Sequence, residues 1–324
     1  MISVINDLAF AVFWYAIPIM VVLLLVSLGG LMSERSGVVN IALEGIMVMG
    51  AFTAATVIYF LRQADDPMGR QWMVLIGLFV GATSGFLFSF FHAFAAVRMQ
   101  SNQIISATAL NMFAPALHIF MARTYIRGTD SINIRTTYRV TVPVLSDLPV
   151  IGPFFSNAFI STYIGIAILI ALTVMFYKTK LGLRLRSCGE NPHAADSLGI
   201  NVGKIRYIGV MMSGLLAGLG GAAYMIAFDN DFDGHVLGLG FLALAMLISG
   251  QWNPLRILVF SIVFSFFYVV SSQHGSIGFL SNLNLPSDIY RLMPFLITLI
   301  ILAFFSKTTQ APKALGEPYD VGKR

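Results

Sequence analysis

Long apolar segments separated by short polar ones dominate the pattern of this 324-residue chain. A helix needs about 20 mostly apolar residues to cross the hydrocarbon layer of a membrane. The pattern therefore predicts an all-α, polytopic transmembrane helical bundle with about 8 to 10 spanning segments, the seventh of which is short. The candidate segments are 10–31, 38–61, 72–96, 103–126, 158–177, 207–228, 236–250, 255–273 and 289–305.

Two polar interruptions qualify this pattern. Residues 250–254 separate the seventh and eighth segments, either as a turn between two spans or as the break of a discontinuous helix that lines a cavity. Residues 127–157 contain Pro143, Pro149 and Pro153 and are too polar to span, so we expect a long external loop.

Small residues recur every four positions in two of the predicted spans. This spacing places them on one helix face and lets two helix backbones approach closely. We predict helix packing there, and the position of the two ladders in opposite halves of the chain suggests an internal pseudo-repeat. The ladders are Gly77, Gly81, Gly85 and Ser89 in the third span and Gly214, Gly218 and Ala222 in the sixth.

Composition and charge agree with a membrane protein. Hydrophobic residues make up 57% of the chain and charged residues 11%, and the mean hydropathy is +0.81. Most Lys and Arg residues fall on one side of the nine-span arrangement, which predicts an external N-terminus and a cytoplasmic C-terminus. The net charge is +5, but the Lys and Arg residues are distributed among particular loops rather than gathered in one patch. The charge therefore does not indicate nucleic-acid binding.

The first apolar segment lacks a preceding basic region and a small-residue cleavage site, so we expect it to stay as a spanning helix. One cysteine, Cys188, excludes an internal disulfide. It lies in a predicted cytoplasmic loop, where thiols stay reduced.

That loop, residues 178–206, is the one long polar and basic stretch between predicted spans. Asn191 followed by Pro192 is typical of a helix start, because Asn caps a helix N-terminus and Pro fits the first helical position. We expect a short helix that ends before Gly199 and offers Ala194 and Ala195 as a compact docking surface.

The sequence predicts neither a catalytic nor a metal site. The five histidines are scattered, with no H-E-x-x-H pair and no cysteines at metal-ligand spacing. Gly199 and Gly203 are too close together for a phosphate-binding loop, and Ile205 stands where Ser or Thr would hold magnesium. Transport would therefore draw its energy from ion coupling or from another polypeptide.

Glu44 is the ionisable residue that we expect deepest in the bundle. A charge at the bilayer centre costs roughly 2.5 to 3.5 kcal/mol on insertion scales and is usually retained for function. Glu44 lies near the inner start of the second span and close to Arg35 in sequence. A structural ion pair with Arg35, a gating role and direct substrate contact are the alternatives, while an ion relay would need more members.

Several motifs form a specific set: GVVNIALEGIMVMGAF at 37–52, Gly189-Glu190-Asn191-Pro192 with Ala194-Ala195 and Gly199-Ile200, and Ser213-Gly214 through Ala217-Gly218 with Gly221-Ala222. This set resembles the permease subunits of bacterial ABC importers for ribose-type sugars, branched-chain amino acids and nucleosides, over most of the chain. Residues 102–105 with Asn111, and residues 252–254, resemble the shorter permease of nucleoside-type importers that pair two different permeases.

The resemblance implies a homo- or heterodimer of permeases in the bacterial cytoplasmic membrane, two cytoplasmic ABC ATPases and an extracytoplasmic substrate-binding protein. ATP and magnesium would be used by the ATPase, and this chain would bind no cofactor. Residues 1–306 would form the permease domain, with 178–206 as its cytoplasmic coupling loop and 307–324 as a cytoplasmic tail. The segment that fits a cleft on the ATPase would comprise Gly189, Glu190, Asn191, Pro192, Ala194, Ala195, Gly199 and Ile200.

Polar side chains inside the apolar helices are candidates for the substrate path, because unpaired polar groups are costly in lipid. Amides pair donors with acceptors and suit a neutral, hydroxyl-rich or nucleobase ligand. The same groups can instead hold helices together. The candidates are Asn40, Glu44, Asn102, Gln103 and Asn111.

These observations predict the permease subunit of an ATP-driven ABC importer for nucleosides, with simple sugars as the alternative within the family. A self-sufficient ion-coupled carrier would transport with this chain alone, whereas an importer subunit is inert without its ATPase. An intramembrane enzyme would need a polar catalytic cluster, which the sequence does not contain.

Overall fold

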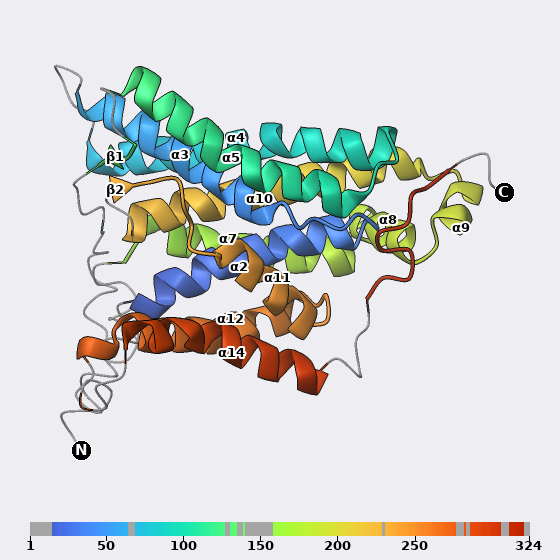
Figure 1. The fold of residues 1–324 in the computed structure, drawn as a ribbon. Coiled ribbons are helices and arrows are strands. Elements are labelled where there is room, and N and C mark those ends of the chain that lie inside the picture. The colour runs from blue at the N-terminus through green and yellow to red at the C-terminus, as the bar shows by residue number, and fades with distance from the viewer. Residues whose placement is uncertain are drawn as a thin grey trace.

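The computed structural model describes residues 15–63, 69–126, 130–134, 139, 158–228, 231–276, 282, 286–305 and 311–320. These residues form an elongated helical bundle with one antiparallel pair of short strands, β1 (Ile132–Asn133) and β2 (Asp231–Phe232). The strand pair lies at one end of the bundle, the strand end, and helices α8 and α9 lie at the other, the α8–α9 end (Figure 1). The predicted all-α, polytopic fold is confirmed.

Each of the nine predicted segments contains a helix, and successive helices run back and forth between the two ends (Figure 1). Seven are long and apolar enough to cross a membrane, while α11 (Leu239–Ser249) is shorter and α14 (Ser287–Phe305) contains a shorter apolar stretch. The seven are α2 (Ile17–Glu34), α3 (Leu43–Arg62), α4 (Arg70–Ala93) with its π-helical extension η2 (Phe94–Arg98), α5 (Gln103–Tyr125), α7 (Ile160–Lys178), α10 (Val202–Phe228) and α12 (Pro254–Ser272). A 3₁₀ turn, η3 (His274–Ser276), follows α12.

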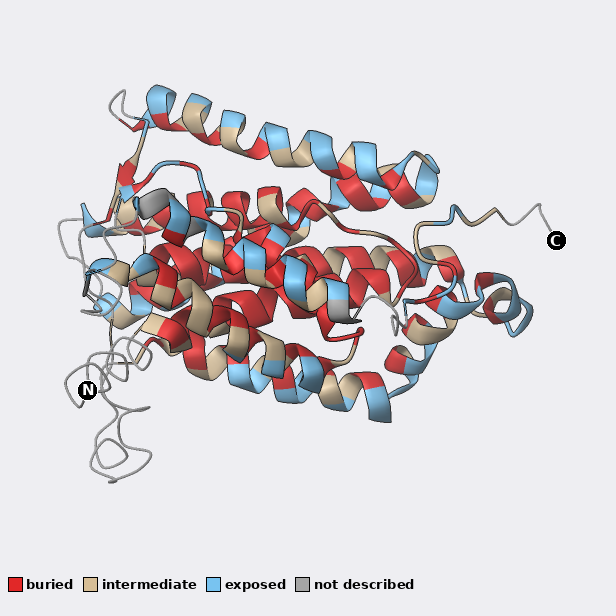
Figure 2. Cartoon of the chain, turned by 60° about the horizontal axis from the view of Figure 1, so that its bottom comes forward, coloured by how far each residue is buried: buried red, intermediate tan, exposed pale blue. Residues whose placement is uncertain are grey.

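Helices α2 and α10 form the centre of the bundle. The most apolar stretch of α2 is 89% buried and that of α10 is 78% buried, against 17% for α5. A helix that is apolar all round belongs in an interior, whereas α5 leaves most of its surface for lipid or another subunit. Figure 2 shows buried residues gathered in the middle of the bundle and exposed ones on its outer faces.

The two small-residue ladders pack against each other. A Cβ atom added to Gly85 of α4 would lie 2.7 Å from the Cα of Gly218 in α10, and one added to Gly81 would lie 2.6 Å from the Cβ of Ala222. Gly214 faces Ser89 in the same interface, while Gly77 faces Ile58 of α3. The ladders therefore let the backbone atoms of α4 and α10 come into direct contact.

The predicted loop 178–206 contains more helix than we expected. Residues 180–190 form α8 (Lys180–Glu190), a helix that we did not predict within this segment. Its polar residues cover one face only, because Leu185 and Cys188 are buried on the other. The short helix α9 (Pro192–Ser197) begins as predicted, with Asn191 Oδ1 accepting a hydrogen bond of 3.0 Å from Ala194 N.

Residues 250–254 form a turn at the α8–α9 end. Gln251 and Trp252 adopt left-handed backbone angles of +51° and +53°, and Asn253 caps α12 by accepting a bond of 3.0 Å from Leu255 N. This interruption is therefore a turn between α11 and α12, although α11 is too short to span a membrane by itself. Of the predicted external loop 127–157, residues 130–134 and 139 are described, and the rest lies outside the described residues.

Candidate functional site

Helices α3 and α11 both begin inside the bundle, which creates a discontinuity in two spans. The 11 residues of α11 end at the α8–α9 end, so at about 1.5 Å per residue its N-terminus lies roughly 16 Å inside the bundle. Residues 38–42 reach the N-terminus of α3 from the α8–α9 end, and residues 233–238 reach that of α11 from the strand end. The two N-termini meet, since a Cβ atom added to Gly240 would lie 2.6 Å from the Cα of Glu44.

Glu44 joins these two helix starts. Its Oε1 accepts a hydrogen bond of 2.9 Å from Gly238 N, and its Oε2 accepts one of 2.7 Å from Gly240 N. The first N–H groups of a helix have no partner within the helix and carry its positive dipole end, so a carboxylate is well placed there.

Of the alternatives for Glu44, the ion pair with Arg35 does not form. Arg35 instead contacts Glu190 at 3.6 Å and donates to the Trp252 carbonyl at 3.0 Å, all at the α8–α9 end. The non-helical residues between Arg35 and Glu44 carry the two side chains to different depths of the bundle.

Two candidate path residues complete the hydrogen bonding of the non-helical segment before α3. Gln103 Oε1 accepts a bond of 2.7 Å from Val39 N, and Asn111 Nδ2 donates one of 2.9 Å to the Ile41 carbonyl. Asn111 Oδ1 also accepts a bond of 2.8 Å from Gly45 N. Irregular backbone at membrane depth needs such partners because lipid offers none.

The other two amide candidates are engaged in packing and capping. Asn40 is fully buried, and its Nδ2 donates to Ser213 Oγ of α10 at 2.9 Å. Asn102 caps α5 by accepting a bond of 2.9 Å from Ile104 N. Neither side chain lines the cavity described next.

A cavity of about 510 Å³ lies where α3, α5 and the start of α11 meet. Glu44 and Asn111 both line it, so the structure brings two of the five path candidates together. Pro115 also lines it, and because proline lacks an N–H, the Asn111 carbonyl four residues earlier receives no helical hydrogen bond from it. The lining residues that the sequence analysis missed include Thr108, Met112, His235 and Phe241.

One side of this cavity is bordered by exposed apolar side chains. Met112 is 73% exposed and Leu237 61%, and Phe241 is also exposed. These residues come from α5 and from the start of α11, so the apolar border continues across two elements. In a membrane, such apolar side chains face either lipid or another subunit.

At the α8–α9 end, contacts link the segment before α9 to two helix ends. Gly189 is buried, and a Cβ atom there would lie 2.5 Å from the Arg35 carbonyl. Glu190 pairs with Arg35, while Glu34 accepts a bond of 2.6 Å from Trp252 Nε1 in the interior. The sequence analysis missed Glu34, because the hydropathy of α2 does not show which helix its last residue meets.

Helix α9 has an inner and an outer face. Pro192 and Ala195 are buried, so the expected surface position of Ala195 is wrong. His193 and Ala194 are exposed, and Leu198 is 82% exposed. The helix stops at Gly199, which has a φ of +78°, and Ile200 N then returns to the Ala195 carbonyl at 3.1 Å. An exposed leucine at the tip of a polar segment is the side chain most suited to docking.

The described part of the chain contains no group of three His, Cys, Asp or Glu side chains that could hold a metal ion. The candidate sites are therefore a cavity inside the bundle and a docking helix at its α8–α9 end.

Residues 14–302 match the family described as "Branched-chain amino acid transport system / permease component". The chain therefore belongs to this family of permeases, and it is a multi-pass membrane component of a transport system rather than an enzyme.

Three relatives are informative. The chain is 40% identical to the nucleoside ABC transporter permease protein NupC of Lactococcus lactis subsp. cremoris, over 92% of each chain. It is 40% identical to the guanosine ABC transporter permease protein NupQ of Bacillus subtilis, over 100% of this chain and 99% of NupQ. It is 24% identical to the nucleoside ABC transporter permease protein NupB of L. lactis, over 90% of this chain and 79% of NupB. No solved structure matches the chain.

Proposed function

We propose that this chain is the permease subunit of an ATP-driven ABC importer that translocates nucleosides across the bacterial cytoplasmic membrane. The observation that carries the proposal is the cavity inside the bundle, where Glu44 and Asn111 face an otherwise largely apolar space. Its volume of about 510 Å³ falls within the range of small-molecule sites. Similarity to NupC and NupQ over nearly the whole chain supports nucleosides as the substrate class.

The position of Glu44 favours a neutral ligand. Helix N-termini inside transporters attract anionic substrate groups, but here the carboxylate of Glu44 already occupies the start of α11. The carboxylate accepts backbone hydrogen bonds from Gly238, Gly240 and Phe241, and its remaining lone pair can accept one from a ribose hydroxyl. Phe241 and His235 add aromatic surface beside this polar group, which suits a nucleobase.

A second permease would close the open side of the cavity. In the proposed assembly, a paralogous permease packs on the apolar border at Met112, Leu237 and Phe241, which lipid would otherwise contact. The chain resembles NupC more closely than NupB, and both are nucleoside permeases of one organism, which supports a heterodimer.

The α8–α9 end would face the cytoplasm and the strand end the outside, where a substrate-binding protein would deliver the ligand. Cations favour the cytoplasmic side, and those at the α8–α9 end of the described helices outnumber those at the strand end. The former are Arg35, Arg98, Lys178, Lys180, Arg184, Arg186, Lys204, Arg206 and Arg256, and the latter Arg62, Arg70 and Arg123. ATP and magnesium would bind to the partner ATPase, with no cofactor on this chain.

Leu198→Glu tests the docking of the ATPase on α9. A charge at this exposed tip should leave folding intact but oppose burial in a partner groove, so the ATPase should no longer co-purify and ATP-driven uptake should be lost. Leu198→Met is the matched control and should keep both. Wild-type uptake by Leu198→Glu would exclude this tip from coupling, and ion-driven accumulation by the purified chain alone would overturn the importer.

The proposed orientation predicts the labelling of two introduced cysteines. Cys188 gives a low background, because burial raises the pKa of its thiol and keeps it protonated. In intact cells, a membrane-impermeant maleimide should label Asp231→Cys at the strand end and spare Ser197→Cys on α9. Ser197→Cys should react after the membrane is opened, and the reverse order of labelling would invert the topology.

A further inference from the structure

The segment 311–320, which the sequence presents as a polar tail, packs on the α8–α9 end of the bundle. Ala314 N donates a hydrogen bond of 2.9 Å to the Gly189 carbonyl, at the end of α8. Gly316 N donates one of 3.0 Å to the Gly37 carbonyl, in the turn after α2. Figure 1 shows the segment running beside α8 toward α9. It therefore connects two parts of the chain that are far apart in sequence.

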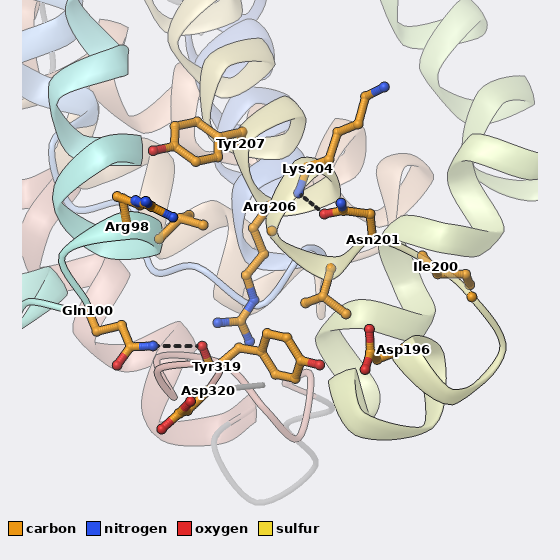
Figure 3. A pocket seen from close by; sticks show the side chains of 14 residues that line it. Arg98, Gln100, Asp196, Ile200, Asn201, Lys204, Arg206, Tyr207, Tyr319 and Asp320 are labelled. Atoms are coloured by element: carbon orange, nitrogen blue, oxygen red, sulfur yellow. Dashed lines mark hydrogen bonds between the residues drawn. The ribbon is translucent and has the colours of Figure 1, made fainter. Parts of the chain in front are cut away.

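Two further hydrogen bonds fasten the segment to the starts and ends of other helices. Nη1 of Arg206, at the start of α10, donates to the Glu317 carbonyl at 2.7 Å. Gln100, in the turn before α5, donates from Nε2 to the Tyr319 carbonyl at 2.9 Å, and Figure 3 shows both side chains reaching toward the segment. Arg206 is only 1% exposed, so this guanidinium lies under the segment rather than in water.

The segment also touches α9 itself. The ring of Tyr319 lies 5.2 Å from the imidazole of His193, on the helix that we propose as the docking element. Apart from its neighbour α8, the main element that α9 packs against is α10. A cavity of about 660 Å³ lies between the α9–α10 connection and the turn at Gln100, and Tyr319 and Asp320 form one of its walls (Figure 3). The end of the segment thus borders this cavity.

The backbone conformation of residues 312–316 suits close packing on the α8–α9 end. Gly316 has a φ of +84°, a conformation that β-branched residues rarely adopt, and a Cβ atom there would lie 3.4 Å from Val39 Cγ2. A Cβ atom on Gly189 would lie 3.3 Å from the Cβ of Pro312. Pro312 and Ala314 are buried, so apolar contacts accompany the hydrogen bonds.

We propose that residues 312–320 act as a coupling strap, which fixes the position of α9 relative to the turn after α2. Gly189 lies in the last turn of α8, three residues before the start of α9, and Gly37 directly precedes the non-helical residues that lead to Glu44. The strap hydrogen-bonds to both glycines. A displacement of α9 by the ATPase is therefore transmitted to the segment beside the substrate cavity. This inference rests on the proposed function of the chain as an ATP-driven permease.

Truncation tests the strap in the reconstituted importer, with ATPase, second permease and binding protein present. A chain ending at Ala311 lacks the strap, while a chain ending at Asp320 keeps every described contact and serves as its control. The strapless importer should hydrolyse ATP but move at least about fivefold less nucleoside per ATP, the lower range of typical coupling between sites. The control should match the full chain.

A point variant covers the case in which the truncated chain does not fold. Gly316→Val keeps the chain length and opposes the left-handed turn, so it should lower the transport-to-ATP ratio in the same direction. Lys313→Ala, at an exposed position of the same segment, should not change it.

Hydrogen exchange of residues 189–200 gives a readout that does not depend on transport. Their amides should exchange faster in the truncated chain and in Gly316→Val than in the two controls, because α9 loses a restraint. Unchanged exchange, or an unchanged transport-to-ATP ratio, would overturn the strap. Absence of ATP-driven uptake by the full chain would instead overturn the proposed function, so the two failures are distinguishable.

Discussion

Glu44→Gln should lower nucleoside uptake by roughly 10- to 100-fold, since hydrogen bonds to a charged group contribute about 1.5 to 3 kcal/mol. Glutamine can accept a bond from Gly238 or from Gly240 but presents an NH₂ group to the other donor. One N–H at the start of α11 then loses its partner, and the positive end of this helix loses its counter-charge beside the cavity. ATP-driven uptake in proteoliposomes, corrected for the amount of folded complex, measures the effect.

A surface carboxylate provides the matched control. Asp231→Asn removes one negative charge from the exposed strand end and should leave uptake close to that of the wild type. Glu44→Gln with wild-type uptake would show that the carboxylate contributes neither to the substrate path nor to the junction of α3 and α11. Loss of folded protein in Glu44→Gln, with normal uptake per folded complex, would restrict Glu44 to a structural role.

The sequence predicts the helices well because hydropathy and small-residue spacing are local properties. Gly214 and Gly218 already indicate a close helix contact, and Asn191 with Pro192 marks the start of α9. Lys180–Glu190 was missed as a helix because its polar composition hides an apolar face at Leu185 and Cys188. An amphipathic helix outside the membrane needs only one buried face, which a search for spanning segments does not detect.

The partners of the buried polar groups could not be predicted, because they depend on tertiary packing. Glu44 bonds to backbone amides almost 200 residues away rather than to the nearby Arg35. Gln103 and Asn111 look like ligand-binding amides in the sequence, yet both hydrogen-bond the backbone before and at the start of α3. Backbone donors and acceptors have no sequence signature, so the non-helical segment before α3 becomes visible only in the three-dimensional structure.

Gly218→Leu should sharply reduce the amount of folded protein in the membrane. A Cβ atom at this position would contact the Gly81 carbonyl and would lie 2.8 Å from the Cα of Gly85, so α4 and α10 would have to separate. Backbone atoms cannot rotate away as a side chain can, and we expect a destabilisation on the order of 3 kcal/mol or more. Membrane yield, elution of the detergent-solubilised protein as a single species and thermal unfolding measure the loss.

Two alanine variants on the same helix separate this steric effect from the general consequence of replacing glycine. Gly218→Ala already places a Cβ atom against backbone and should lower the unfolding temperature. Gly203→Ala, whose nearest neighbour would lie 3.6 Å away, should not lower it, because alanine favours a helix over glycine. Equal stability of Gly218→Leu and the wild type would mean that α4 and α10 do not meet at this ladder, and the central contact of the bundle would then lie elsewhere.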